Sequence, residues 1–218
     1  MDNQLKQQPR NNIAFVLGNG RSRLNADLNI LKAYGTIYGC NALYREFEPD
    51  HLIAVDVKMV NEIIASGYHR THSVWTNPNK GVSTKNNVNF FSPHKGWSSG
   101  PTALYFAAQQ GYKKIYILGF DYQGLAGKFN NVYADTFNYK KSSDAATFHG
   151  NWLSQTDKVI KEYKSIKFYR VVEDVNAFVP DILSTNHTNL QHINYSEFMG
   201  TFQSTDIYLD KINQKTTI

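Results

Sequence analysis

A glycine-rich turn near the start of the chain is a candidate phosphate site. Gly18-Asn19-Gly20 directly follows the apolar run Ile13–Leu17, and Ser22 comes two residues later. Glycine lets a backbone approach an anion closely, and a helix after such a turn presents unpaired amides to it. The spacing matches neither the dinucleotide fingerprint, because Arg23 takes the third glycine position, nor a Walker loop. We therefore weigh phosphate binding against a tight turn with only a structural role.

Polar side chains end three further apolar stretches. Asn41 offers a donor and an acceptor to a base or a ribose. The Asp56 carboxylate could accept from a ribose, hold a metal or take a proton, and Asp121 follows Gly119 in the same manner. A helix cap is the alternative for Asn41 and Asp56. The two carboxylates together could hold a metal, although the sequence does not fix their distance.

Further candidates lie at two expected helix starts. The run Ser98-Ser99-Gly100-Pro101 offers hydroxyls and free amides to an anion, with simple capping as the alternative. His149 ends a long aperiodic stretch just before a helix and is the candidate base among seven histidines. Cys40 is interpreted as a small buried residue. The chain has neither a Gly-x-Ser-x-Gly elbow nor a His-Glu-x-x-His motif, which disfavours esterases and metalloproteases.

Alternating strands and helices must position these residues. Strands are predicted at Ile13–Leu17, Thr36–Gly39, His51–Val55, Ser73–Trp75, Val88–Phe91, Lys114–Leu118 and Lys167–Val171, and helices at Asn25–Ala33, Val57–Ser66, Pro101–Gln110 and Asn151–Tyr163. This order predicts an α/β fold, a Rossmann-like, doubly wound and mainly parallel sheet, in which ligands sit beyond the carboxyl ends of strands. Tyr122–Gly150 is predicted to be a lid loop.

Composition and length bound the class of protein. The 218 residues suit one domain, predicted at 13–202 between tails at 1–12 and 203–218. One cysteine excludes an internal disulfide and a Cys-built zinc site. Apolar runs are too short to cross a bilayer, and the polar start shows no signal peptide, so we expect a cytoplasmic protein. The net charge of +5, without a basic block, favours an anionic small ligand over nucleic acid.

Taken together, the strand ends resemble those of bacterial sialyltransferases that use CMP-sialic acid. The resemblance rests on Leu17-Gly-Asn-Gly-Arg-Ser22, Cys40-Asn41, Ser99-Gly100 and Gly111-Tyr-Lys-Lys-Ile-Tyr-Ile-Leu-Gly-Phe-Asp-Tyr122. The stretch Glu48-Pro-Asp-His-Leu-Ile-Ala-Val-Asp56 instead resembles a related group, which joins motility accessory factors to hydroxymethylpterin diphosphokinases. The pieces occur in the same order over about residues 13–163.

The resemblance implies residue roles. It puts Gly18, Asn19, Gly20 and Ser22 around the nucleotide phosphate and sugar, Asn41, Ser99, Gly100 and Asp121 around the cytidine, and Tyr133 beside the leaving phosphate. Two positions depart from the sialyltransferase pattern. Asp56 stands where those enzymes tend to have Asn, and His149 precedes Gly150, whereas their catalytic His follows a glycine.

Three functional hypotheses follow. The first is a glycosyltransferase that needs no cofactor and transfers a sugar from a CMP-sugar to a hydroxyl acceptor, with His149 as base. The sequence does not decide whether the acceptor is a glycan, a protein or modified DNA. It also does not decide whether the chain self-associates. The second is a diphosphokinase that uses ATP and Mg²⁺, with Asp56 and Asp121 on the metal. The third is a nucleotide-binding or structural module of the same fold without catalysis.

Overall fold

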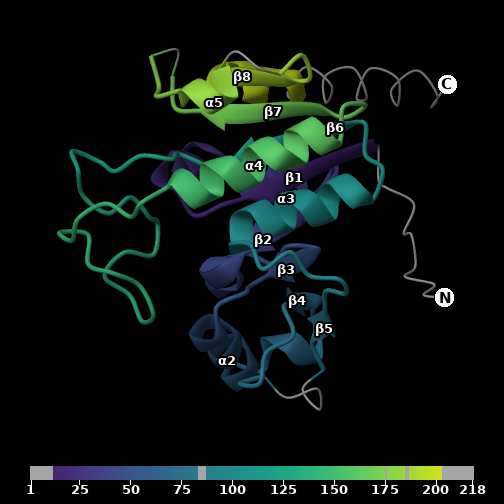
Figure 1. Ribbon diagram of the computed structural model, residues 1–218, viewed down its shortest axis with the longest axis vertical. Helices are drawn as coiled ribbons and strands as arrows, with labels where there is room; N and C mark the ends of the chain where they lie inside the picture. The colour runs from purple at the N-terminus through teal and green to yellow at the C-terminus, as the bar shows by residue number, and fades with distance from the viewer. Residues whose placement is uncertain (1–11, 83–86, 175, 185–186, 203–218) are drawn as a thin grey trace, which may run out of the picture.

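The described part of the chain forms one eight-stranded parallel sheet (Figure 1). The structure is a computed structural model that describes residues 12–82, 87–174, 176–184 and 187–202. Its strands are β1 (Ile13–Leu17), β2 (Thr36–Cys40), β3 (His51–Ile53), β4 (Val74–Thr76), β5 (Asn89–Phe90), β6 (Lys114–Leu118), β7 (Lys167–Val172) and β8 (Leu190–Asn194). The doubly wound α/β fold is confirmed. The predicted tails lie outside the described residues, except for Asn12.

The strand order creates a single switch point between β1 and β6. The order is β5-β4-β3-β2-β1-β6-β7-β8, so the chain builds outward from β1 on one side and then returns to build outward on the other. Phe15 on β1 pairs with Ile37 of β2 and with Tyr116 of β6. Loops at the carboxyl ends of β1 and β6 leave in opposite directions here, which opens a crevice for a ligand.

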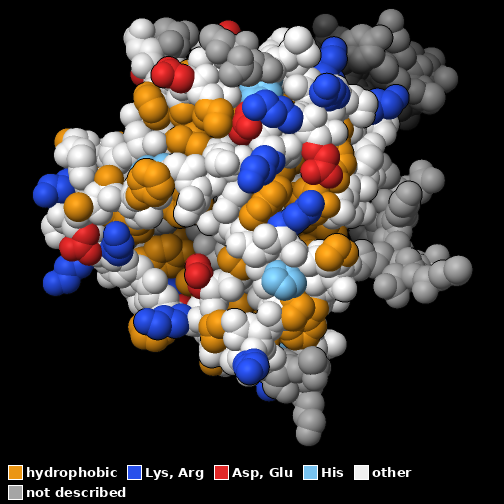
Figure 2. Space-filling view, viewed as in Figure 1, with side chains coloured by type: hydrophobic (Ala, Val, Ile, Leu, Met, Phe, Trp, Pro, Cys, Tyr) orange, Lys and Arg blue, Asp and Glu red, His pale blue; other side chains and the backbone are white. Residues whose placement is uncertain are grey.

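Two apolar layers cover the sheet because side chains alternate along each strand. Phe15 and Leu17 face a core that also contains α2 (Val57–Ala65) and Phe198. Ala14 and Val16 face the opposite core, which is covered by α3 (Ser99–Gln109) and α4 (Gly150–Glu162). Figure 1 shows α3 and α4 side by side over the same face. Figure 2, in the same view, shows Lys and Arg side chains interspersed with apolar ones on the outer surface of this layer. The remaining helices are α1 (Leu28–Leu31), α5 (Asp181–Ser184) and the 3-10 turns η2 (Arg21–Asn25), η3 (Asn41–Arg45) and η4 (Tyr68–Arg70), and residues 195–202 are also helical.

The predicted helix that starts at Asn25 is wrong. Residues 21–25 instead form η2, and the short helix α1 begins after Asp27, whose side chain accepts from the Asn29 amide. The 3-10 turn has a tertiary cause, because the backbone and side chain of Ser22 both bind Asp121. The helix α3 also begins earlier than predicted, with Ser98 as its N-cap.

The predicted lid segment is a loop, but much of it is fixed to the body of the domain. The Val132 amide donates to the Asn19 carbonyl at 2.8 Å, and Arg45 donates to Thr136 and to the carbonyl of Phe137. Within the loop, isolated β-bridges such as that between Leu125 and Lys128 occur beside turn hydrogen bonds such as that from the Asp135 amide to the Lys140 carbonyl. In Figure 1 the loop reaches well away from the sheet beyond the start of α4. Closure over a ligand stays a prediction.

Candidate functional site

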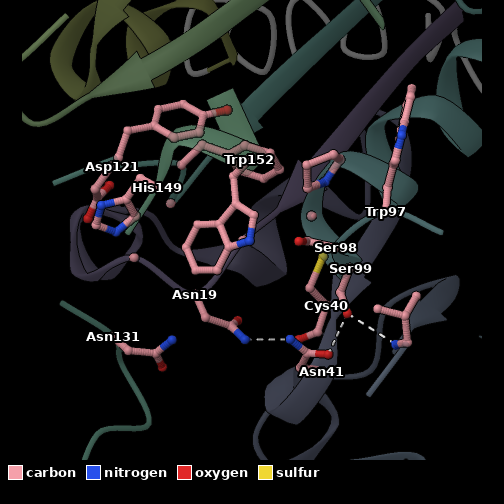
Figure 3. Close-up of a pocket in the computed structure, with 18 of the residues that line it drawn as sticks. Asn19, Cys40, Asn41, Trp97, Ser98, Ser99, Asp121, Asn131, His149 and Trp152 are labelled. Atoms are coloured by element: carbon pink, nitrogen blue, oxygen red, sulfur yellow. Dashed lines mark hydrogen bonds between the residues drawn. The ribbon is translucent and has the colours of Figure 1, made fainter. Parts of the chain in front are cut away.

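A cavity of about 490 Å³ lies at the switch point, along the carboxyl ends of β1, β2, β3, β4 and β6 (Figure 3). It is lined by Gly18, Asn19, Gly20, Cys40, Asn41, Val55, Asp56, Asn77, Gly96, Trp97, Ser98, Ser99, Gly100, Pro101, Gly119, Phe120, Asp121, Tyr122, Gln123, Asn130, Asn131, His149 and Trp152. We call it the central cavity. Its volume is typical of small-ligand sites. It brings together all the predicted site residues except Ser22 and Tyr133.

The glycines of the first turn are needed for packing between strand ends. A Cβ on Gly18 would lie 2.6 Å from the Gly119 carbonyl oxygen, and one on Gly20 would lie 2.5 Å from the Asp121 carboxylate. Their amides are also used, because Gly18 donates to Leu118 and Gly20 to Gly119. Both glycines therefore have the structural role in a tight turn that the sequence offered as the alternative to phosphate binding. Among the described residues, the Asn19 amide is the one in this turn without a partner.

Asn19, Asn41 and Ser99 form an ordered polar wall. The Asn19 side chain is 8% exposed and donates to the Cys40 carbonyl at 3.2 Å, while its Oδ1 has no partner among the described residues. Asn41 has a left-handed backbone with φ of 54°, and its Oδ1 accepts from the Ser99 hydroxyl at 2.8 Å. The Ser99 Oγ in turn accepts from the Val55 amide. Both asparagines therefore present amide groups in fixed orientations to the cavity.

Three helices begin at the central cavity. Asp56, Ser98 and His149 occupy the N-cap positions of α2, α3 and α4, and none of them makes a side-chain capping bond. None of the three helices has an acidic residue in its first turn. Each helix start carries about half a positive elementary charge on its unpaired amides. The Asp56 carboxylate is exposed at the rim, so the capping interpretation of this residue is not supported.

His149 lies beside Asp121 at one end of the central cavity (Figure 3). Its ring contacts Trp152 edge to face, with ring centroids 5.2 Å apart. Burial lowers the pKa of His149 below its ordinary value, and the charge of Asp121 offsets part of that effect. The imidazole is therefore neutral near pH 7, as a general base must be.

Asp121 lines the central cavity as predicted, and its carboxylate is also a structural acceptor. Its Oδ1 accepts from the Ser22 hydroxyl at 2.5 Å, and its Oδ2 accepts from the Ser22 amide and from Asn130. Ser22 thus ties η2 to the end of β6 and does not line the central cavity. With three donors already bound, Asp121 is poorly suited to a metal. Among the described residues no three His, Cys, Asp or Glu side chains gather where they could hold one.

Tyr133 lies outside the central cavity, contrary to the expected contact with a leaving phosphate. Its hydroxyl donates to Glu46 at 2.6 Å and accepts from Arg23 at 3.2 Å. Burial raises the pKa of Tyr133 far above its ordinary value. Burial likewise raises the pKa of the Cys40 thiol to about 12, which agrees with a small buried residue and not with a nucleophile. Arg23 is buried in this cluster and also lies outside the cavity.

Several lining residues received no role from the sequence, among them Asn77, Trp97 and Trp152. Asn77 directly follows β4, so the strand-end signal that identified Asn41 also applied to it. Trp152 lies on the first turn of α4, three residues after the candidate base. Both tryptophans are partly exposed at the cavity and offer flat apolar surface to a ring.

Comparisons of the chain with protein-family models, with curated proteins and with solved structures gave no match. The function must therefore be inferred from the chemistry of the site itself. Among the described residues, no helix combines the length and the apolar character that a bilayer span requires.

Proposed function

We propose that the central cavity binds a nucleotide and that the protein is a glycosyltransferase with a nucleotide-sugar donor, a CMP-sugar being favoured. The proposal is carried by one observation: the starts of α3 and α4, which have no side-chain cap and no acidic residue at the N-cap or in the first turn, meet at a single cavity. Such a place attracts a phosphate. The unpartnered Oδ1 of buried Asn19 supports it, since a ligand hydroxyl or amine would satisfy that acceptor.

Each part of a nucleotide finds matching chemistry in the cavity. The start of α3 suits the phosphate. The backbone amides of Ser99 and Gly100 have no partner among the described residues and are available to an anion, whereas Pro101 has no amide hydrogen. The fixed amide of Asn41 suits a ribose or base edge. The Trp152 ring suits a base or sugar face.

The proposed reaction is a direct displacement at the anomeric carbon of the donor. The acceptor hydroxyl oxygen forms a bond to that carbon, and the bond from the carbon to the phosphate oxygen breaks. The nucleoside phosphate leaves with the bonding electrons, and the helix starts stabilise its charge. The acceptor proton passes to a ring nitrogen of neutral His149. The exposed Asp56 is the second candidate base.

The diphosphokinase alternative receives less support from the same cavity. It needs Mg²⁺ between Asp56 and Asp121, and both side chains do line the cavity. The carboxylate of Asp121 is nevertheless occupied by Ser22 and Asn130. The residues present therefore do not fit a two-carboxylate metal site.

Thermal unfolding with added nucleotides tests the proposal. CMP should raise the melting temperature, by the equivalent of about 2.7 kcal/mol at a hundred times its dissociation constant. Asn19→Ala should remove most of this shift, whereas Asn61→Ala, an exposed position on α2, should retain it. Stabilisation by ATP only with Mg²⁺, and not by CMP, would favour the diphosphokinase. Stabilisation by neither nucleotide would reject a nucleotide site.

A charge variant tests the helix starts directly. Ser98→Asp adds a carboxylate at the N-cap of α3, where the present serine makes no capping bond. The unliganded protein should gain about 0.3–1 kcal/mol from charge and dipole. CMP should bind more weakly because the new charge repels its phosphate. An unchanged CMP shift would place the phosphate elsewhere.

A further inference from the structure

A second cavity lies on the other side of Asp121 from the central cavity. It has a volume of about 670 Å³ and opens beyond the carboxyl ends of β1, β6 and β7. Its lining includes Leu24, Leu125, Glu173 and Phe178. We call it the β7-side cavity, and the proposed nucleotide does not use it.

The two cavities share one wall. Asp121, Gln123 and Asn130 line both of them. Asn130 donates to the Asp121 carboxylate at 3.0 Å and accepts from the Arg21 amide at 3.1 Å, so the wall is held in place. His149 stands beside Asp121 on the central side (Figure 3). A transferase must bring the reacting atoms of its two substrates into contact. For ligands in these adjoining cavities, that contact is open only at the edge of the shared wall.

Part of the mainly polar lining of the β7-side cavity is apolar. Leu24 is 57% exposed, and Leu125 and Phe178 are each 44% exposed. These are three of the five strongly exposed large apolar side chains among the described residues, and all three line this cavity. Arg170 fixes the position of Phe178 by donating to its carbonyl at 3.0 Å. Apolar side chains gathered in a concave surface indicate a ligand site.

The same cavity contains a carboxylate that is free to accept hydrogen bonds from a ligand. Glu173 is exposed and makes no hydrogen bond or ion pair to any described residue. The guanidinium of Arg170, in contrast, already donates to the carbonyls of Phe120, Asp121 and Phe178 through each of its three nitrogens. A ligand here meets an apolar face beside a carboxylate. A pyranose matches both, since its C–H face packs on apolar side chains and its hydroxyls donate to a carboxylate.

We propose that the β7-side cavity binds a neutral pyranoside, the hydroxyl-bearing acceptor of the transfer reaction. The inference rests on the proposed function for the role of acceptor, while the binding site itself rests on the lining residues. The acceptor hydroxyl reaches the donor at the edge of the shared wall, where His149 takes its proton.

Saturation-transfer NMR with methyl glycosides of galactose, glucose and mannose tests the inference. At least one should receive saturation from the wild-type protein. Phe178→Ala should weaken its binding about tenfold, since an aromatic face is lost. Glu173→Gln should weaken it less, because the amide oxygen still accepts. Phe137→Ala is the matched control, since Phe137 is an exposed loop residue outside this cavity.

The outcomes separate this inference from the proposed function. The CMP thermal shift should be unchanged in Phe178→Ala, which also shows that the variant is folded. CMP binding without any pyranoside binding would overturn this inference alone. Pyranoside binding that is lost in Phe178→Ala, without CMP binding, would retain the sugar site and reject the nucleotide site. Unchanged pyranoside binding in Phe178→Ala, or a dimer in sedimentation that this variant abolishes, would overturn the sugar site.

Discussion

His149 is the side chain whose protonation state decides whether the proposed reaction can run. Its ring is half-buried, and burial lowers its pKa. His149→Ala should reduce turnover about 10²–10⁴-fold. CMP binding should persist, because the proposed phosphate contacts come from backbone amides. Steady-state kinetics and the CMP thermal shift measure the two effects separately.

The control for this variant is His94→Ala, which removes an exposed histidine outside the central cavity. Its turnover should equal that of the wild type. Normal turnover in His149→Ala would reject the base assignment, and Asp56→Asn would then be the next variant to measure.

Tyr133 tests whether a buried hydroxyl has a structural or a catalytic role. Tyr133→Phe removes the bond to Glu46 and leaves buried Arg23 with one partner fewer. The variant should lose about 1–3 kcal/mol of unfolding free energy in urea titrations. Its affinity for CMP should not change. A variant with wild-type stability and weakened CMP binding would restore the predicted contact with the phosphate.

At the level of elements, the close approach of β1 and β6 at their carboxyl ends depends on glycine. In Gly20→Ala the new Cβ would meet the Asp121 carboxylate and the Gly119 carbonyl. Such overpacking typically costs about 1–3 kcal/mol. Gly200→Ala is the matched substitution, because a Cβ there has no atom within 4 Å and the position is helical. It should gain up to about 1 kcal/mol. Urea unfolding of both variants measures this contrast, and equal effects would contradict it.

Strands were more predictable from the sequence than the site's internal contacts. β1 and β6 were predicted to the residue, because strands buried on both faces are continuous apolar runs. The 3-10 turn η2 was not predicted, because it depends on the bond from Ser22 to Asp121, which lies 99 positions away. No local pattern reveals that pair. The same limit applies to Tyr133, whose partner Glu46 comes from a distant segment. Strand ends therefore located the cavity, while tertiary hydrogen bonds decided which polar residues stay available to a ligand.

For the whole molecule, three histidines make stability depend on pH. Burial lowers the pKa values of His51, His149 and His192. Below about pH 6.5 the unfolded chain therefore binds more protons than the folded one. The unfolding free energy should fall as the pH decreases through that value, and it should be fully retained above it.

Urea titrations from about pH 7.5 to about pH 5.5 would measure this dependence. His149→Gln should make the decline shallower, because it removes one of the three contributors. A stability that is constant or rises over this acidic range would contradict the prediction.

Because part of the long loop is fixed to the domain, we expect the protein to stay assembled after the chain is cut in this loop. Exposed Lys140 and Lys141 lie beyond residues that bind the body of the domain, such as Asn138, which donates to Glu62. Trypsin should cut after these lysines, and the two resulting fragments should remain bound to each other. The fragment with β6 and the fragment with β7 stay joined along a parallel ladder that pairs Ile115 with Phe168. The nicked protein should elute as one species in size exclusion and separate only under denaturing conditions. Fragments expressed apart should then reassemble on mixing, and their failure to co-elute would show that the ladder needs an intact chain.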